Sequence, residues 1–247
     1  MTKYSRIADD LREAIMTGEY PPGSTLPSIP DLVTRYDVAR DTVRDAIGLL
    51  TNEGLVTPKR GIGTVVRAID PVMLSYSVRA PAQTWQAQTA GAGRDDVVQA
   101  EWTNADAEVA GRLAISTGSR VVHRVRHFTK GHGIAQISEQ WVPEHIAEAI
   151  QANGDGDLAN VARRPDTDRN LFELMSSAGH APAETTEIIS TRMPDPTERD
   201  TMEIPPGVPV LITHRVTREA NGQPVETTTA IGAGDRMSAQ LTVPLMY

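Results

Sequence analysis

The first seventy residues of the chain place three short helical patterns between strong helix breakers, and this order restricts the fold more than any other feature of the sequence. In the first pattern, apolar residues recur at helical spacing at Ile7, Leu11, Ala14 and Ile15. We expect Ser5 to cap this helix and Gly18 to end it. Pro21 and Pro22 then exclude a helix across the connection EYPPGSTLPS.

Two further short helices are expected after this connection. Ser28 begins the second helix, because Asp31 stands at capping-box distance and Pro30 is tolerated in a first turn. Its buried face consists of Leu32, Val33 and Tyr36. The third helix is expected from about Arg40 to Asn52, and Gly54 ends it. Its apolar stripe consists of Val43, Ala46, Ile47 and Leu50.

A basic hairpin completes this region. β-Branched residues predict two short strands, near Leu55 to Thr57 and Thr64 to Arg67, joined by a Pro/Gly-rich turn. Three small helices followed by such a hairpin form a winged helix-turn-helix, a fold that binds double-stranded DNA. The expected wing tip has two cations, no acid, and glycines that permit a close approach to a sugar–phosphate backbone, at Lys59, Arg60, Gly61 and Gly63.

The third helix presents two arginines where such a fold contacts DNA. Arg40 and Arg44 lie one turn apart, about 6 Å along the helix axis, so that both guanidiniums can enter one major groove. There an arginine donates two hydrogen bonds to the O6/N7 edge of guanine. Asp41 and Asp45 share this outward face, so a solvated helix with balanced Arg–Asp pairs is the alternative. The order of helix, turn, helix and basic wing favours DNA recognition.

The distribution of charge is compatible with a DNA partner, although the chain as a whole is acidic. The formal net charge is −8, but residues 1–67 contain nine Lys/Arg and nine Asp/Glu. The remaining 15 basic and 23 acidic residues therefore carry the whole excess. Because a local patch contacts the phosphates, the neutral N-terminal region remains a candidate DNA-binding domain.

These residues resemble the winged-helix domain of GntR-type bacterial transcriptional regulators over nearly the whole region, without a gap. The matching motifs are PPGSTLPS, the VxRxTVR start of the third helix, the LxxEGLV exit and the GxGTxV wing. The resemblance implies that bases, phosphates and the minor groove are contacted by Ser28, Arg40, Thr42, Arg44, Gly61 and Gly63. Two positions depart from the family pattern: Ala39 replaces a capping Ser, and Pro30 replaces an operator-contacting Arg. The expected fold is unaffected, whereas the operator sequence is left open.

Beyond the winged helix, the chain is expected to form a linker and a second domain. Residues 69–93 are rich in Pro, Ala, Gln and Gly and are interpreted as an irregular linker and domain entry. Afterwards strand patterns alternate with helix patterns, with strands at 97–103, 120–129, 134–142, 208–219 and 223–231 and helices at 104–115, 170–179 and 196–204. The order helix, glycine turn, strand, hairpin, strand occurs twice, and the tripeptide His-Arg-Val recurs at His123 and His214. We predict an α+β fold with an antiparallel sheet, with domains at residues 1–68 and 94–247.

This second domain resembles the UTRA effector-binding domain of HutC-type GntR regulators, whose fold is like that of chorismate lyase. The matching segments are RVVHRVRHF, Ser138–Glu139 before Trp141–Val142–Pro143, NLFELMSSAGHAP, and NGQPVE with AGDR near the end. The resemblance implies a small effector, often a sugar phosphate or another acid, that releases or rearranges the protein on its operator.

One strand of this domain offers a candidate anion site. The strand period of two places Arg124 and Arg126 on one face, about 7 Å apart, and His123 and His127 on the other face. Two guanidiniums on one face can bind a phosphate or a carboxylate. A lattice of Arg–Glu salt bridges across the sheet is the alternative.

The resemblance adds two carboxylates to this candidate site and also shows departures. It implies that Glu139 and Glu226 contact the effector from neighbouring strands. Ala233 replaces the Arg usual before the terminal Gly-Asp, and Arg169–Asn170 replace the usual Ser ahead of the central helix. A different ligand, or a vestigial site, is therefore an open alternative.

Motifs for catalysis, metal binding and membrane insertion were not found in the sequence. The chain has no cysteine, which excludes disulfides, thiolate metal sites and a Cys nucleophile. His123 and His127 do not form the helical metal pair on a strand, and no Gly-x-Ser-x-Gly elbow or phosphate loop occurs. No run approaches the roughly 20 apolar residues of a membrane span, and MTKYSRIADD lacks the apolar middle of a secretory signal. We expect no cofactor; an enzyme of chorismate-lyase-like fold is the less favoured alternative.

The sequence therefore predicts a cytoplasmic homodimer that represses transcription by covering a palindromic operator. Dimerisation is expected because one winged helix covers only a half-site, and a two-fold operator requires a two-fold protein. A small acidic effector is expected to modulate binding. A repressor with a vestigial sensor, as in regulators of plasmid transfer, is the alternative.

Overall fold

A computed structural model of the chain describes residues 2–68, 71–77, 92–131, 133–163, 169–243 and 245. Its contacts divide the chain into two compact units, which are described separately. The winged-helix unit comprises Met1–Pro71, Met193–Pro209 and Gly234–Arg236. The sheet unit comprises Val72–Arg192, Val210–Ala233 and Met237–Tyr247.

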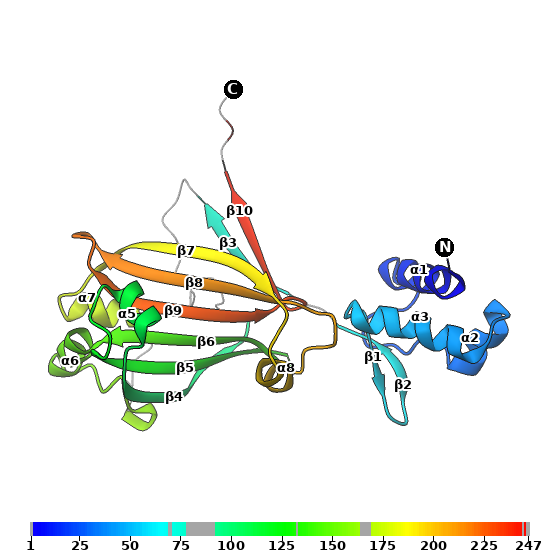
Figure 1. Ribbon diagram of the computed structural model, residues 1–247, viewed down its shortest axis with the longest axis horizontal. Helices are drawn as coiled ribbons and strands as arrows, with labels where there is room; N and C mark the ends of the chain where they lie inside the picture. Colours follow the sequence, from blue (N-terminus) through cyan, green and yellow to red (C-terminus); the bar gives the residue numbers. More distant parts are fainter. Residues whose placement is uncertain are drawn as a thin grey trace. The chain divides into compact units, whose positions relative to one another are not determined.

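The winged-helix unit contains the three predicted helices and the predicted hairpin (Figure 1). The elements are α1 (Lys3–Met16), α2 (Ile29–Tyr36), α3 (Arg40–Asn52), β1 (Val56–Lys59) and β2 (Gly63–Val66). β1 and β2 pair antiparallel, with Val56 opposite Val66 and Lys59 opposite Gly63. The winged helix-turn-helix fold is thereby confirmed. Its contacts also assign α8 (Pro196–Met202) to this unit.

The helix caps agree with the sequence at α2 and differ at α1. Ser28 and Asp31 form the predicted capping box, in which the Ser28 hydroxyl accepts from the Asp31 amide at 3.4 Å. The prediction of Ser5 as the first cap was wrong, because α1 begins one turn earlier and the Thr2 hydroxyl accepts from the Ser5 amide. Ala39 precedes α3 without a side-chain cap, as the departure from the family pattern predicts.

The core of this unit is built from the predicted apolar stripes. α1, α2 and α3 bury their aliphatic side chains against one another and against the hairpin, at Ile7, Ala8, Leu11, Leu26, Leu32, Val43, Ala46, Ile47, Leu50, Val56 and Val66. A bidentate ion pair joins α1 to the end of α3, because Arg12 donates to both Glu53 oxygens at 2.6 and 2.8 Å. The core and this pair fix the outward face of α3.

The sheet unit has the predicted α+β fold with an antiparallel sheet. Six strands lie in the order β4 (Arg94–Asn104), β5 (Arg120–Lys130), β6 (Gly133–Pro143), β9 (Pro224–Ala233), β8 (Val210–Glu219) and β7 (Pro182–Arg192). The two predicted hairpins, β5–β6 and β8–β9, are adjacent through β6 and β9 at the centre of the sheet.

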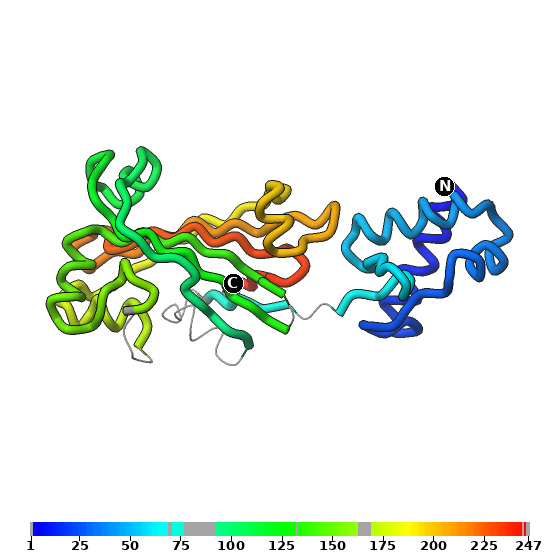
Figure 2. The backbone as a smooth tube through the Cα atoms, turned by 90° about the horizontal axis from the view of Figure 1, so that it is seen from below, coloured from blue at the N-terminus to red at the C-terminus, as the bar shows by residue number. Residues whose placement is uncertain are grey.

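Short helices cover both faces of this sheet. Figure 2 shows α5 (Ala107–Leu113) on one face, and α6 (Glu144–Ala152) and α7 (Leu171–Ser177) on the other. α5 packs against Val121 and the half-buried Trp141. On the opposite face, α6 and α7 pack against Val122 and Val142. The short 3-10 turn η1 (Val161–Arg163) lies beside β4.

A separate parallel pair of strands adds to this unit. β3 (Val72–Ser77) pairs with β10 (Met237–Thr242), with Val72 opposite Met237. The interpretation of residues 69–93 as irregular was therefore wrong at β3, where alternate apolar side chains pack against Phe128 and Ala135. The rest of that predicted linker, at residues 69, 70 and 78–91, lies outside the described residues.

Candidate nucleic-acid interface and effector pocket

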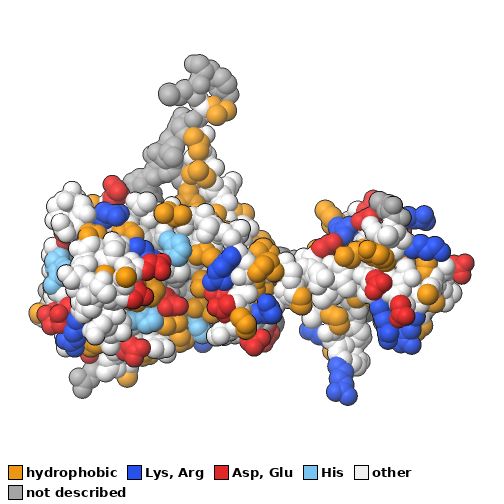
Figure 3. Space-filling model, viewed as in Figure 1, with side chains coloured by type: hydrophobic (Ala, Val, Ile, Leu, Met, Phe, Trp, Pro, Cys, Tyr) orange, Lys and Arg blue, Asp and Glu red, His pale blue; other side chains and the backbone are white. Residues whose placement is uncertain are grey.

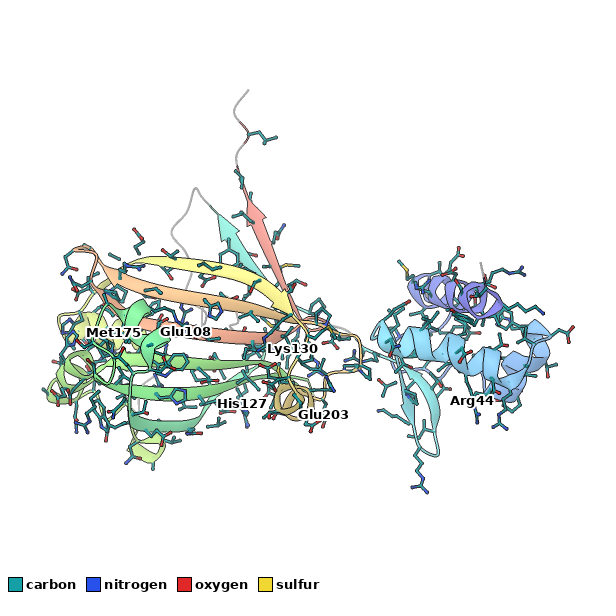
Figure 4. All side chains as sticks on the ribbon, viewed as in Figure 1. Arg44, Glu108, His127, Lys130, Met175 and Glu203 are labelled. Atoms are coloured by element: carbon teal, nitrogen blue, oxygen red, sulfur yellow. The ribbon has the colours of Figure 1, made fainter. Side chains whose placement is uncertain are left out.

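The outward face of α3 presents the predicted arginines to solvent. Arg40 and Arg44 are exposed, Thr42 is half-buried, and the intervening apolar positions face the core. Arg44 Nη1 lies 3.4 Å from Asp41 Oδ1, a long contact between two exposed side chains. Figure 4 shows Arg44 on the side of α3 toward which the β1–β2 hairpin extends. An exposed ion pair of this kind is weak, so the Arg44 guanidinium can exchange its partner for a base edge.

The wing has the backbone that its glycines predict. The Ile62 amide donates to the Lys59 carbonyl at 3.1 Å and closes the turn. Gly61 has φ +77° and Gly63 has φ +119°, values that L side chains rarely adopt. Lys59 and Arg60 are exposed, and Figure 3 shows Lys/Arg side chains gathered at the tip of this hairpin. The tip is therefore a narrow cationic projection with little side-chain bulk at its glycines.

Ser28 has a structural role in addition to its predicted phosphate contact. Its hydroxyl donates to Asp31 Oδ2 at 2.6 Å while it caps the N-terminus of α2. A phosphate at this position would compete with Asp31 for the same hydroxyl. The other predicted DNA contacts of the winged-helix unit lie on α3 and the wing, at Arg40, Thr42, Arg44, Lys59, Arg60, Gly61 and Gly63.

In the sheet unit, the strand register separates two faces. The arginine face carries Arg124, Arg126 and Arg215, and the histidine face carries His123, His127 and His214. Across the arginine face, one row of directly opposed residues consists of Arg124, Gln140, Thr228, Arg215 and Glu187. The next row consists of Arg126, Ser138, Ala230, Thr213 and Ile189.

A pocket lies over these two rows. β3 contributes Leu74 and Tyr76, and α7 and its cap contribute Asn170, Leu171 and Phe172. The sheet contributes the polar lining, at Arg126, Gln136, Ser138, Gln140, Glu187, Thr213, Arg215 and Thr228. Mixed polar and apolar walls with two guanidiniums suit a small polar ligand.

Both guanidiniums in the pocket have acidic partners. Arg126 Nη2 lies 2.5 Å from Asp95 Oδ2. Arg215 lies 3.0 Å from Glu226 and 3.9 Å from Glu187. Tyr76 donates to Glu187 at 2.6 Å, and burial with this hydrogen bond raises the pKa of the Tyr76 phenol above its usual value.

Glu226 lies beneath the pocket, fully buried. Its carboxylate accepts hydrogen bonds from Thr217, Thr228, Gln140 and Arg215 at 2.6–3.1 Å. Burial alone would raise the pKa of Glu226, but the charge of Arg215 and these hydrogen bonds lower it below the usual range. Glu226 therefore orients Arg215 and Gln140, which line the pocket.

The structure does not bring the four predicted effector residues together on one face of the sheet. Arg126 lines the pocket. Arg124 lies in the neighbouring row of the same face and donates a hydrogen bond to Gln140 at 3.2 Å. Glu226 lies on the same face beneath Arg215. Glu139 lies on the histidine face, 3.1 Å from His123 Nε2, because its position on β6 has the opposite parity to Ser138 and Gln140. The expectation that Glu139 joins this arginine site is therefore corrected.

Arg215 supplies the second guanidinium of the pocket, and the sequence predictions missed it. It is the middle residue of the second His-Arg-Val, as Arg124 is of the first. Because the two hairpins are equivalent in the sheet, this repeat was the available signal for Arg215.

The histidines of the second face belong to packed contacts. His123 stacks on Trp141 with ring centroids 4.9 Å apart. Burial lowers the pKa of His127, and the nearby Asp96 opposes this effect. Among the described residues, no group of three His, Cys, Asp or Glu is arranged to hold a metal ion. In the same part of the chain, no helix is long and apolar enough to cross a membrane.

Comparisons with known families match both parts of the chain. The sequence profile described as "Bacterial regulatory proteins, gntR family" matches residues 3–66. The profile described as "UTRA domain" matches residues 93–238.

Similar proteins of known type are transcriptional regulators. An uncharacterized HTH-type transcriptional regulator of Streptomyces coelicolor is 30% identical over 250 residues, covering 96% of this chain and 90% of the relative. The HTH-type transcriptional regulator GgaR of Escherichia coli is 28% identical over 230 residues, covering 90% of this chain and 84% of the relative.

Solved structures share the arrangement of both units' elements. A crystal structure assigned to the GntR family of transcriptional regulators has a TM-score of 0.65 at 27% identity, and the match covers 100% of this chain and 99% of that one. PhnF from Mycobacterium smegmatis has a TM-score of 0.58 at 20% identity, covering 99% of this chain and 100% of PhnF, which shows a shared fold.

Proposed function

Because the chain belongs to the GntR family of bacterial regulatory proteins and carries a UTRA domain, we propose that it is a repressor that covers a palindromic operator as a homodimer. Its relatives are transcriptional regulators, so it is a DNA-binding regulator and not an enzyme. The combination of a winged helix with a UTRA domain supports assignment to the HutC-type regulators. We infer that the protein acts in the cytoplasm, where its operator lies.

One observation carries the proposal of operator recognition. Arg40 and Arg44 are exposed on α3, and in the same unit the wing presents Lys59 and Arg60. A recognition helix contributes base contacts and a wing contributes backbone contacts, so the two together read a half-site. One winged helix covers one half-site, which supports a two-fold complex.

Footprinting upstream of the gene and its neighbours tests this proposal. A protected palindrome of two half-sites one helical turn apart, bound by two chains, is the expected result. Arg44→Ala should remove the footprint, whereas Arg6→Ala should leave it, because Arg6 is an exposed arginine on α1. Protection that is independent of sequence, or unchanged by Arg44→Ala, contradicts the proposal.

The pocket supports modulation by a small acidic effector, such as a sugar phosphate or an organic acid. Arg126 and Arg215 both line it, and a guanidinium binds phosphate or carboxylate through two parallel hydrogen bonds. An acid entering the pocket would replace Asp95 or Glu187 as the partner of an arginine.

A thermal-shift screen of phosphorylated sugars and small acids tests the effector. A true effector should raise the melting temperature of the full chain and weaken operator binding. Arg126→Ala should abolish both effects while operator affinity without effector stays nearly intact. Arg120→Ala is the matched control, because Arg120 lies on the same strand and pairs with Glu144 outside the pocket lining.

A second candidate is a repressor with a vestigial sensor, controlled by its own concentration. It is favoured by one observation: the acids Asp95, Glu187 and Glu226 already neutralise both pocket arginines. Under this alternative, no acid in the screen shifts the melting temperature, and Arg126→Ala changes neither the melting response nor operator binding.

A further inference from the structure

Ile62 is an apolar side chain at the tip of the wing, where the surface is otherwise cationic. It is 64% exposed and lies outside the described core of the winged-helix unit. Its neighbours along the chain are Arg60, Gly61 and Gly63, and residues 58–66 contain no acid. A single exposed apolar residue is common on protein surfaces. Ile62 differs because it stands among cations that are placed to meet a polyanion.

The backbone of the wing presents the Ile62 side chain by itself. The turn is closed by the hydrogen bond from the Ile62 amide to the Lys59 carbonyl at 3.1 Å. Gly61 and Gly63 both have positive φ, and a Cβ placed on either glycine would have no neighbouring atom within 4 Å. The space on both sides of Ile62 is therefore open, and backbone of this conformation disfavours larger residues there. Ile62 is consequently the side chain that a narrow groove admits first.

The place of the wing beside α3 points to the minor groove. The recognition helix of such a fold lies in the major groove, and the hairpin extends on the side of α3 that carries Arg44 (Figure 4). Because major and minor grooves alternate along a duplex, a projection beside a helix in the major groove crosses the phosphate ridge and meets the minor groove. Lys59 and Arg60 then face the ridge, and Ile62 faces the groove.

The minor groove distinguishes base pairs mainly by one chemical group. A·T and T·A expose only acceptors there, whereas G·C adds the N2 amino group of guanine, a donor that projects into the groove. An aliphatic side chain cannot accept a hydrogen bond from this amino group and collides with it. Over A·T pairs the same side chain can pack against the base edges, as apolar side chains do in other minor-groove complexes. An isoleucine at the groove floor therefore favours A·T over G·C.

α3 leaves this part of the recognition open. Arg40 and Arg44 match the O6/N7 edge of guanine, so α3 favours G·C pairs. The first two turns of α3, residues 40–47, contain neither Asn nor Gln, the side chains that bind adenine through two hydrogen bonds. Thr42 can contact a thymine methyl group, but it is half-buried. Recognition of A·T pairs is therefore left mainly to another part of the winged-helix unit.

We propose that Ile62 is a specificity-determining residue that enters the minor groove of the operator and selects A·T pairs there through apolar contact. The proposal rests on the proposed operator complex and adds a base-reading side chain to its wing. Each half-site then combines guanines that α3 contacts in the major groove with A·T pairs that Ile62 contacts in the adjacent minor groove. The selection depends on the absence of the guanine amino group and on no hydrogen bond from Ile62.

Base analogues in the footprinted operator separate the two grooves in anisotropy titrations of the full chain. The pairs to be changed are the A·T pairs whose minor groove the protein protects from hydroxyl radicals beside each half-site. Replacing adenine by 2,6-diaminopurine adds the N2 amino group and keeps the major-groove pattern of adenine. Inosine·C does the reverse, with the minor groove of A·T and the major groove of G·C. Affinity should fall about tenfold on the diaminopurine duplex and stay within about threefold on the inosine duplex.

Variants at Ile62 assign this discrimination to its side chain. Ile62→Ala should weaken binding to the natural operator about threefold to tenfold and bind the diaminopurine duplex equally well, within about twofold. Ile62→Leu keeps an apolar side chain of the same size and should keep the preference for A·T. Met16→Ala is the matched control, because Met16 is an apolar side chain of the same unit that is 77% exposed at the end of α1. Circular dichroism should be unchanged in all three variants, since both positions are exposed.

Two alternating copolymers extend the test to DNA without an operator. Poly(dI-dC) and poly(dG-dC) share their major-groove pattern and differ at the N2 amino group in the minor groove. The unmodified chain should bind poly(dI-dC) about fivefold more tightly, and Ile62→Ala should bind both copolymers alike.

The outcomes distinguish this inference from the proposed function. Where footprinting finds a palindrome, equal binding of its diaminopurine duplex, an unchanged preference in Ile62→Ala, or wing-protected minor grooves at G·C pairs overturns the role of Ile62 and leaves the operator proposal standing. Where footprinting finds no preferred site, the operator proposal is wrong and the copolymers decide. A preference for poly(dI-dC) that Ile62→Ala removes then supports the minor-groove contact, and equal binding of both copolymers by the unmodified chain overturns it.

Discussion

Arg44 and Lys59 are both exposed cations of the winged-helix unit, but they differ in what they are placed to contact. Arg44 lies one turn inside α3, where a recognition helix meets base edges. If it bonds a guanine edge, Arg44→Ala should cost about 1–3 kcal/mol on the operator and far less on unrelated DNA. Lys59 lies at the wing, so Lys59→Ala should weaken binding to both duplexes by similar factors.

Anisotropy titrations on operator and scrambled duplexes, at several salt concentrations, measure both effects. Lys59→Ala should also reduce the salt slope by about one phosphate contact per protomer. Equal losses on both duplexes for Arg44→Ala would mean that it contacts phosphate alone. Base recognition would then have to come from Arg40, Thr42 or the wing.

Glu226 predicts an acid sensitivity of the sheet unit. Its folded pKa lies below the usual value of about 4.3, because the charge of Arg215 and hydrogen bonds from Thr217, Thr228 and Gln140 favour the carboxylate over the cost of burial. A depressed carboxyl pKa stabilises the fold fully above the unfolded pKa, and this contribution is lost as the pH falls through the folded pKa. The free energy of unfolding should therefore fall below about pH 4.3.

Urea unfolding between pH 3 and 7 checks this prediction with Glu226→Gln. At neutral pH the variant should lose about 3 kcal/mol, because it leaves Arg215 buried beside an uncharged partner. Below about pH 4 its deficit relative to the unmodified chain should shrink progressively, since the unfolded chain then binds a proton at Glu226 that the folded chain must give up. Glu184→Gln, at an exposed position, should show neither effect. A deficit that is constant across this range would contradict the role given to Glu226.

At the residue scale, strand parity decides which site predictions agree with the structure. The period of two correctly places Arg124 and Arg126 together and opposite His123, because β5 is regular through these positions. Glu139 was assigned by resemblance without a parity test, and its strand turns it to the histidine face. Arg126's partner Asp95 could not be predicted, because a bulge in β4 shifts the register after Val97.

At the scale of the elements, α3 lacks a side-chain N-cap, although the residue before it has the backbone conformation of an N-cap. Ala39 has φ −65° and ψ 150°, the extended conformation of an N-cap, but no side-chain oxygen. Ala39→Ser should accept a hydrogen bond from the first turn of α3 and raise the free energy of unfolding of this unit by about 1 kcal/mol.

Urea unfolding monitored by the helical circular dichroism signal measures this gain. Ala14→Ser is the matched control, because it introduces the same hydroxyl inside α1, where serine lowers helix propensity by about 0.5 kcal/mol. If both substitutions destabilise the unit, the α3 terminus is satisfied in another way and the missing cap has no energetic consequence.

The elements that sequence patterns predicted are those whose apolar period is expressed locally. The α3 boundaries, Arg40–Asn52, agree with its stripe and its glycine stop. β3, β7, β10 and the helix α6 were not predicted, although α6 has a local apolar period. β7 is an edge strand with mixed polar and apolar residues, and β3 lies in a segment whose composition indicates a linker. β3 pairs with β10, which is distant in sequence, and β7 pairs with β8, which follows it along the chain after α8.

For the whole molecule, the distribution of charge separates specific from general DNA affinity. Residues 1–67 are neutral overall, while the rest of the chain carries the net charge of −8. A polyanion repels the acidic part, so productive contact depends on a few exposed cations placed in the winged-helix unit. This balance lowers non-specific binding and leaves contacts at a matched half-site as the main source of affinity.

The salt dependence of operator binding reports how many winged-helix units engage the DNA. With roughly three phosphate contacts per protomer, a dimer on the full palindrome should give a slope of log K against log salt near −5, at about −0.9 per phosphate. A duplex shortened to a single half-site should give about half that slope, because only one unit then has phosphates within reach. Anisotropy titrations of the full chain on both duplexes, between about 50 and 200 mM salt, measure the two slopes. Equal slopes would mean that a single unit contacts DNA in both complexes, and the two-fold model of operator binding would be wrong.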